Sequence, residues 1–102
     1  MLLVPRSLIL FAGWKRIENL EAYTDVRALY LEGNGLRTIE GLEHMKQLRC
    51  LYLQENCISC MQNLEFAELN TLNLASNFIE RIEGLGACKQ LNTLIISNNR
   101  LK

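Results

Sequence analysis

The chain has 102 residues with 11 acidic and 11 basic side chains, so its formal net charge is zero, and 49% of its residues are hydrophobic. A chain of this length forms one small domain at most. Its basic residues are scattered, which argues against a nucleic acid or an anionic membrane surface as the main partner. No apolar run is long enough to span a membrane, so we expect neither a nucleic-acid nor a membrane partner.

The stretch 1–13 has a composition that superficially resembles a signal peptide. However, a Pro-Arg pair interrupts the apolar run, the start carries no positive charge, and no small-x-small cleavage site follows. We favour a degenerate first coil of a repeat array, in which Gly13 stands where later coils carry asparagine and Trp14 closes the end of the core. We therefore interpret residues 1–25 as a capping half-repeat followed by a first turn.

From Val26 onward one eleven-residue pattern occurs four times. Apolar residues occupy its first, fourth, sixth and eleventh places and asparagine its ninth. The four asparagines, spaced by 22, 21 and 22 residues, are Asn34, Asn56, Asn77 and Asn99. This is the signature of a leucine-rich repeat, and a fixed period of this length predicts stacked coils rather than a globule. Residues 26–102 are expected to form four such repeats, the last one incomplete.

The Leu-x-Leu centre of each repeat predicts a short parallel strand whose alternate side chains face into the coil. A second motif, Ile-x-x-Leu or Met-x-x-Leu, follows each strand and has glycine or asparagine, which tolerate positive φ, at its third place: Asn19, Gly41, Asn63 and Gly84. We expect a backbone turn there, leading into a loop, 3₁₀ or short helical segment such as residues 43–47. The predicted fold is a right-handed α/β solenoid with short parallel strands on its concave face and these segments on its convex face.

The repeated asparagine and the single shortened repeat each predict a structural detail. An amide at the ninth place can donate to and accept from backbone groups exposed by the turn, so the asparagines should link each coil to the next as a ladder. One residue is missing between Leu64 and Leu69 compared with the other coils, so we expect a tighter connection there.

The final repeat lacks a following turn and a polar cap. The core beside Leu94, Ile96 and Leu101 would then lie open, next to an unpaired edge strand. We expect the chain to be a piece of a longer protein; the alternative is that another chain covers this edge, for instance by self-association.

No arrangement of residues indicates catalysis. His44 is the single histidine and is expected at the convex surface. A recurring glutamate is interpreted as serving solubility and turn geometry rather than metal binding, and no phosphate-binding glycine motif is present. The four cysteines follow no disulfide framework, and Cys57 and Cys60 have no second pair with which to complete a zinc site. We expect free thiols in the cytoplasm, no metal, no cofactor and no enzymatic activity.

The strand residues that face away from the core should line the concave sheet. The candidate protein-binding residues among them and just beyond them are Tyr30, Glu32, Tyr52, Gln54, Glu55, Asn73 and Ile95. Tyrosines on a rigid sheet are enriched among interface hot spots, and the glutamates beside them suggest a partner carrying Lys or Arg. Equally open is the reading that the tyrosines only pack on each other and shield the sheet.

The run Arg16-Ile-Glu-Asn-Leu-Glu-Ala-Tyr-Thr-Asp-Val-Arg-Ala-Leu-Tyr-Leu-Glu-Gly-Asn34 resembles the leucine-rich-repeat dynein axonemal assembly factors, as do residues 39–43 and 48–56. The resemblance implies a scaffold for preassembly of axonemal dynein arms, located in the cytoplasm, cilium or flagellum. Its implied partners are dynein chains or assembly chaperones. Two alternatives remain: a regulatory module that binds a protein phosphatase through the same concave face, and a structural ciliary or cytoskeletal repeat protein.

Overall fold

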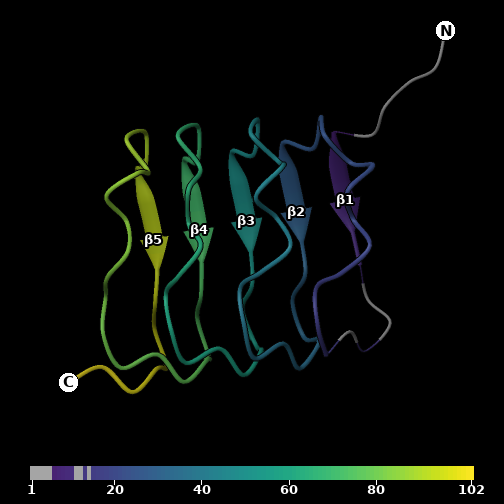
Figure 1. The fold of residues 1–102 in the computed structure, drawn as a ribbon. Coiled ribbons are helices and arrows are strands. Elements are labelled where there is room, and N and C mark those ends of the chain that lie inside the picture. The colour runs from purple at the N-terminus through teal and green to yellow at the C-terminus, as the bar shows by residue number, and fades with distance from the viewer. Residues whose placement is uncertain (1–5, 11–12, 14) are drawn as a thin grey trace, which may run out of the picture.

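The computed structural model describes residues 6–10, 13 and 15–102. It contains one sheet of short strands: β1 (Ser7–Ile9), β2 (Ala28–Tyr30), β3 (Cys50–Tyr52), β4 (Thr71–Asn73) and β5 (Thr93–Ile95). The strands lie side by side in chain order, and every neighbouring pair is parallel (Figure 1). Each strand returns to the start of the next through a long connection on the other side (Figure 1). The chain is therefore a parallel-strand solenoid, which confirms the stacked coils expected from the repeat period.

The register of the sheet places equivalent residues of successive repeats opposite each other. Leu29 pairs with Leu51, Leu51 with Leu72, and Leu72 with Leu94. The first three of these leucines are fully buried, while their strand neighbours on both sides are half-buried. This alternation is what the Leu-x-Leu pattern predicts, because successive side chains of a strand point to opposite faces.

The core is one continuous column of apolar side chains stacked between coils, from Ile17 to Cys88. The return connections also bury apolar side chains, such as Met45 and Phe66. The burial weakens in the last coil, where Leu101 is 44% exposed. The predicted plug at the opposite end, Trp14, lies outside the described residues.

The connection at residues 43–47 is a loop of two turns and is not helical, so of the loop, 3₁₀ or short helical segment expected there the structure has the loop. The Met45 N–H bonds the Leu42 carbonyl oxygen and the Leu48 N–H bonds the Met45 carbonyl oxygen, which makes two successive three-residue steps rather than a continuous ladder. The described residues contain no helix of any kind. The reason is that Leu42, Met45 and Leu48 are all buried, so the chain must turn toward the core at every third residue.

The shortened third connection is tighter, as expected. It retains one such turn, closed by the hydrogen bond from the Leu69 N–H to the Phe66 carbonyl oxygen. The Phe66 side chain is 1% exposed, so a larger ring fills the interior where the second coil uses Met45.

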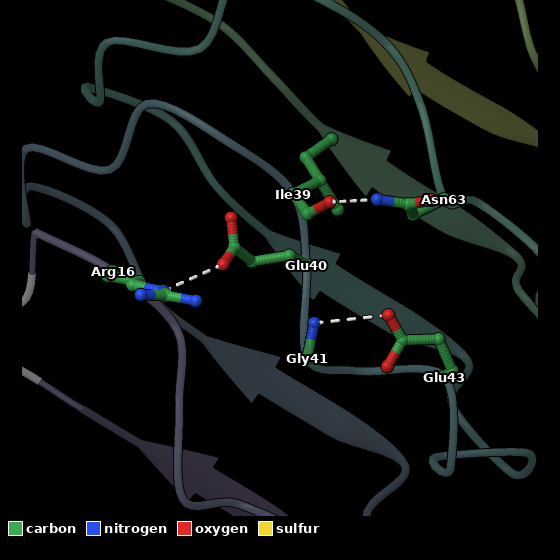
Figure 2. Close-up of polar contacts among 6 residues, drawn as sticks. All are labelled: Arg16, Ile39, Glu40, Gly41, Glu43 and Asn63. Carbon is green, nitrogen blue, oxygen red and sulfur yellow. Dashed lines mark hydrogen bonds and ion pairs between the residues drawn. The ribbon is translucent and has the colours of Figure 1, made fainter.

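The glycine and asparagine places after the strands have the predicted positive φ. The angles are 63° at Asn19, 73° at Gly41, 58° at Asn63 and 72° at Gly84. Figure 2 shows the contact that an asparagine makes at this place, where the Asn63 Nδ2 donates to the Ile39 carbonyl oxygen of the preceding coil at 2.6 Å. This row of turns therefore also links neighbouring coils.

The glutamates that recur beside these turns are not all free surface charges. Glu40 is paired with Arg16 of the preceding coil, with 2.9 Å between Nε and Oε1 (Figure 2). Arg16 is exposed, so this ion pair contributes little to stability. Glu40 nevertheless pairs with a charge of the preceding coil, so solubility is not its only role among the recurring glutamates.

Candidate functional site

The concave sheet is held from beneath by the asparagines. The Nδ2 of Asn56 donates to the carbonyl oxygens of Leu53 in its own coil and Leu31 in the preceding coil, at 2.9 and 3.0 Å. Its Oδ1 accepts the backbone N–H groups of Asn34 and Leu36 at 3.0 Å. These bonds fix the chain where it leaves the strand, so the residues just beyond each strand have defined positions.

The other asparagines repeat this arrangement. Asn34, Asn77 and Asn99 each donate to two carbonyl oxygens of their own coil and one of the preceding coil. Asn34, Asn56 and Asn77 are 3–5% exposed, so the amides satisfy backbone groups that water does not reach. The four side chains form one column behind the sheet.

A second row of positive φ follows the strands, and sequence reasoning missed it. It comprises Gly33, Glu55, Ser76 and Asn98, with φ between 55° and 69°. Glutamate and serine rarely adopt this conformation, so only Gly33 and Asn98 carried a signal in the sequence. Backbone bonds to the next coil impose it, such as the one from the Glu55 N–H to the Ala75 carbonyl oxygen at 3.0 Å. The exposed Glu55 side chain is therefore presented from a rigid backbone.

Tyr30 and Tyr52 form the centre of the concave surface. They are paired in the register of β2 and β3, and their rings stack with centroids 4.6 Å apart and 10° between the planes. Both residues remain half-buried, so each ring packs on the other yet keeps part of its surface in solvent. Packing on each other and contact with a partner are thus compatible in this geometry.

Polar residues lie at the end of the same two strands. The Gln54 Nε2 donates to the Glu32 Oε2 at 3.0 Å, which ties the two coils together at the surface. The Gln54 Oε1 is buried and has no hydrogen-bond partner among the described residues. With Glu55 beside them, these side chains make the end of β2 and β3 acidic.

The two remaining candidates extend the central row of the sheet. Asn73 pairs with Tyr52 in the register, and Ile95 pairs with Asn73. The Asn73 Oδ1 accepts the Ala75 N–H at 3.1 Å, so part of this side chain serves the local turn. Ile95 is 38% exposed. Across the sheet the side chains in this row therefore change from aromatic to amide to aliphatic. We name these residues the central row: Tyr30, Tyr52, Asn73 and Ile95.

Two groups on the chain hold their protons more tightly than usual. Burial raises the pKa of the Tyr52 hydroxyl, and the neighbouring Cys50, Tyr30 and Glu32 raise it further. Burial also raises the pKa of the Cys88 thiol, whose Sγ lies 3.2 Å from the Leu64 carbonyl oxygen. Both groups are therefore neutral at physiological pH, and neither is a poised nucleophile.

Neither the histidine nor the acidic residues assemble a reactive centre. His44 is half-buried, and its Nε2 lies 2.7 Å from the Leu20 carbonyl oxygen, so the ring links two coils. In the described part of the chain no three His, Cys, Asp or Glu side chains are grouped so as to hold a metal ion. All four cysteines are free thiols.

Comparison with known proteins adds no relative to this description. No protein-family profile matches the chain. The curated proteins include none with a significant match either. Residues 6–10, 13 and 15–102 also contain no helix with the length and hydrophobicity needed to cross a membrane.

Proposed function

We propose that this chain is a non-catalytic scaffold of the leucine-rich repeat class that binds another protein through its concave face. The observation that carries the proposal is the Tyr30–Tyr52 stack at the centre of a sheet held rigid by the asparagine column. Large aromatic surfaces on a rigid backbone form contacts at low entropic cost, because little side-chain and backbone freedom is lost on binding. Acidic side chains at one border of the stack favour a partner that carries Lys or Arg there.

The biological role that we infer is scaffolding during preassembly of axonemal dynein arms. Its support is the resemblance of residues 16–34, 39–43 and 48–56 to the leucine-rich-repeat assembly factors of that process. Dynein chains or assembly chaperones are the partners in this proposal. The cytoplasm of ciliated or flagellated cells is the location.

The proposal is tested by affinity capture from extracts of ciliated cells. The wild-type chain should retain dynein heavy or intermediate chains together with chaperones, whereas Tyr52→Ala combined with Glu55→Lys should lose them. A matched control is Glu83→Lys, which changes an exposed convex glutamate and should leave capture intact. All three chains should have the same far-ultraviolet circular dichroism, because none of the changes removes a fully buried side chain.

The outcome also separates the alternatives. Capture of a phosphatase catalytic subunit would favour the regulatory module, and capture of tubulin or assembled axonemes would favour the structural protein. If dynein chains remain bound after both concave changes, the concave face is not the binding surface.

A further inference from the structure

The start of β2, β3, β4 and β5 contains a backbone irregularity that brings an extra residue to the surface. The N–H groups of Arg49 and Cys50 both bond the Arg27 carbonyl oxygen, at 2.8 and 2.9 Å. As a result two consecutive residues lie outside the core between Leu48 and Leu51, which are fully buried. Two residues facing outward in succession are typical of a β-bulge.

The preceding coil has the same irregularity and also uses an arginine. Arg27 and Ala28 share the Arg6 carbonyl oxygen as acceptor, at 2.7 and 2.9 Å. In the two following coils an asparagine stands at this place, Asn70 and Asn92. Arg6 stands at the same place before β1, so arginines mark the starting end of β1, β2 and β3, and the last two of these strands carry the tyrosine stack.

The opposite end of these two strands is negative. Glu32 follows β2 and Glu55 follows β3. Glu32 comes five positions after Arg27, which corresponds to about 16 Å along an extended strand. Along β2 and β3 the surface is thus positive where the strands start, aromatic at the tyrosine stack and negative where the strands end. The two charged ends lie roughly two Debye lengths apart at physiological salt.

Among the described residues the four charged side chains of this surface form no ion pair, although Glu68 lines the same hollow as Arg49 and Glu32 accepts a hydrogen bond from Gln54. The ion pairs within the described residues are Arg16–Glu40 and Lys102–Glu80, and neither includes the arginines or glutamates of this surface. The acidic residue nearest to Arg27 along the chain, Asp25, accepts a hydrogen bond from the Gln47 Nε2 at 3.3 Å.

On this basis we propose that the segment bound on the tyrosine stack has a fixed charge order: acidic residues over Arg27 and Arg49, apolar residues over the tyrosines, and basic residues over Glu32 and Glu55. The inference rests on the proposed function, since it specifies the chemistry of the partner at that same surface. It excludes a uniformly basic segment, which the glutamates alone would suggest, because the arginine end repels it.

The experiment uses two synthetic peptides of identical composition and about nine residues, long enough to span both ends when extended. One has the order Glu-Glu-Ser-Leu-Ser-Leu-Ser-Lys-Lys, and the other has one glutamate and one lysine at each end. Binding is followed by nuclear magnetic resonance titration of the isotope-labelled chain. The segregated peptide should bind roughly fivefold or more tightly, and the preference should vanish in 1 M salt, where the Debye length is about 3 Å.

Charge-reversal variants identify the groups responsible. Arg27→Glu with Arg49→Glu makes both ends acidic and should remove the preference for the segregated peptide. Adding Glu32→Lys and Glu55→Lys restores opposite ends with inverted polarity, and the preference should return because the peptide can bind in the reverse direction. If the fourfold variant does not fold, Arg49→Gln combined with Glu55→Gln decides instead: it should weaken the preference, because only Arg27 and Glu32 remain as opposite charges, and an unchanged preference would overturn the charge order.

Equal resonance shifts with both peptides, including no shift with either, would overturn the charge order. So would a folded fourfold variant that does not regain the preference. Failure of the proposed function looks different, because then Tyr52→Ala combined with Glu55→Lys would leave capture of the cellular partner unchanged. A charge order that fails while this combination still abolishes capture leaves the concave binding surface standing and removes only the inference.

Discussion

The side-chain amide of Asn56 donates a hydrogen bond to the Leu31 carbonyl oxygen at 3.0 Å and so joins the coil of β3 to the coil of β2. The same side chain accepts the Leu36 N–H, also at 3.0 Å. A single buried amide thus bonds backbone groups of two coils. Its removal would deprive the buried Leu36 N–H of its acceptor in a place that water does not reach, whereas the Leu31 carbonyl oxygen would still accept the Asn34 Nδ2.

We therefore expect Asn56→Ala to lower the free energy of unfolding by on the order of 1–3 kcal/mol. Asn56→Asp retains an acceptor for the Leu36 N–H but loses the amide donor, and should also destabilise the chain. Urea unfolding followed by circular dichroism measures both. The exposed Asn92→Ala is the matched control, and a loss for Asn56→Ala no larger than for this control would contradict the role of the column.

The turn at Gly41 predicts that alanine and asparagine at this position lower the stability of the fold by different amounts. Gly41 has a φ of 73°, and a Cβ there would lie 2.9 Å from the Ile17 carbonyl oxygen of the preceding coil. Gly41→Ala should therefore cost at least about 1–2 kcal/mol, because an alanine pays for the left-handed conformation and meets backbone that cannot easily move.

Gly41→Asn should cost less than Gly41→Ala. Asn63 occupies the equivalent place one coil later and donates to the Ile39 carbonyl oxygen, so an asparagine at Gly41 has an acceptor in the Ile17 carbonyl oxygen. Thermal unfolding of the two variants gives the order. Equal or greater loss for asparagine would show that this row is not a second coil-to-coil link.

The stacking of Tyr30 on Tyr52 predicts that the two side chains are energetically coupled in the free energy of unfolding. Tyr30→Leu and Tyr52→Leu each remove one ring of a pair whose centroids are 4.6 Å apart. The double-mutant cycle should give a coupling on the order of 0.5–1.5 kcal/mol in unfolding free energy. Coupling near zero would mean that the rings contribute nothing to each other's stability, and the shielding interpretation would then fail.

The raised pKa values of Tyr52 and Cys88 predict how stability depends on pH. The folded chain holds these two protons more tightly than the unfolded chain does, so it gains stability at pH values where both groups are protonated. That gain should be lost as the pH rises above the ordinary thiol value of about 8.5 and then the tyrosine value of about 10. Unfolding midpoints in urea between pH 7 and 11 test the direction, and Cys88→Ala should remove the first part of the decline.

The thiols should also differ in reactivity with iodoacetamide at neutral pH. Cys60 is exposed and should be alkylated in the folded chain, whereas Cys88 is 7% exposed with a raised pKa and should react only after unfolding. Mass spectrometry of the folded and the urea-unfolded chain distinguishes the two sites. Equal alkylation of both thiols in the folded chain would show that the last coil opens readily.

The sequence alone was sufficient to predict the stacked coils and the strands. The residue pattern within each repeat predicts which side chains point into the core and which point outward. Neighbouring repeats must align because their asparagines and leucines have the same spacing. The positive φ at Gly41 and Asn63 was likewise predictable, since few residue types tolerate it. These features are local or periodic, so a single chain carries them in its order of residue types.

Only the tertiary structure decided the rest. It decided between the loop, 3₁₀ and short helical forms expected at residues 43–47 and made this segment a loop of two turns that buries Met45. It imposed a left-handed conformation on Glu55 through bonds to the next coil. It also kept both Arg49 and Cys50 outside the core, with their N–H groups on one carbonyl oxygen that belongs to the preceding coil. In the last two cases the deciding partner lies about one repeat away, where the preferences of a local segment have no influence.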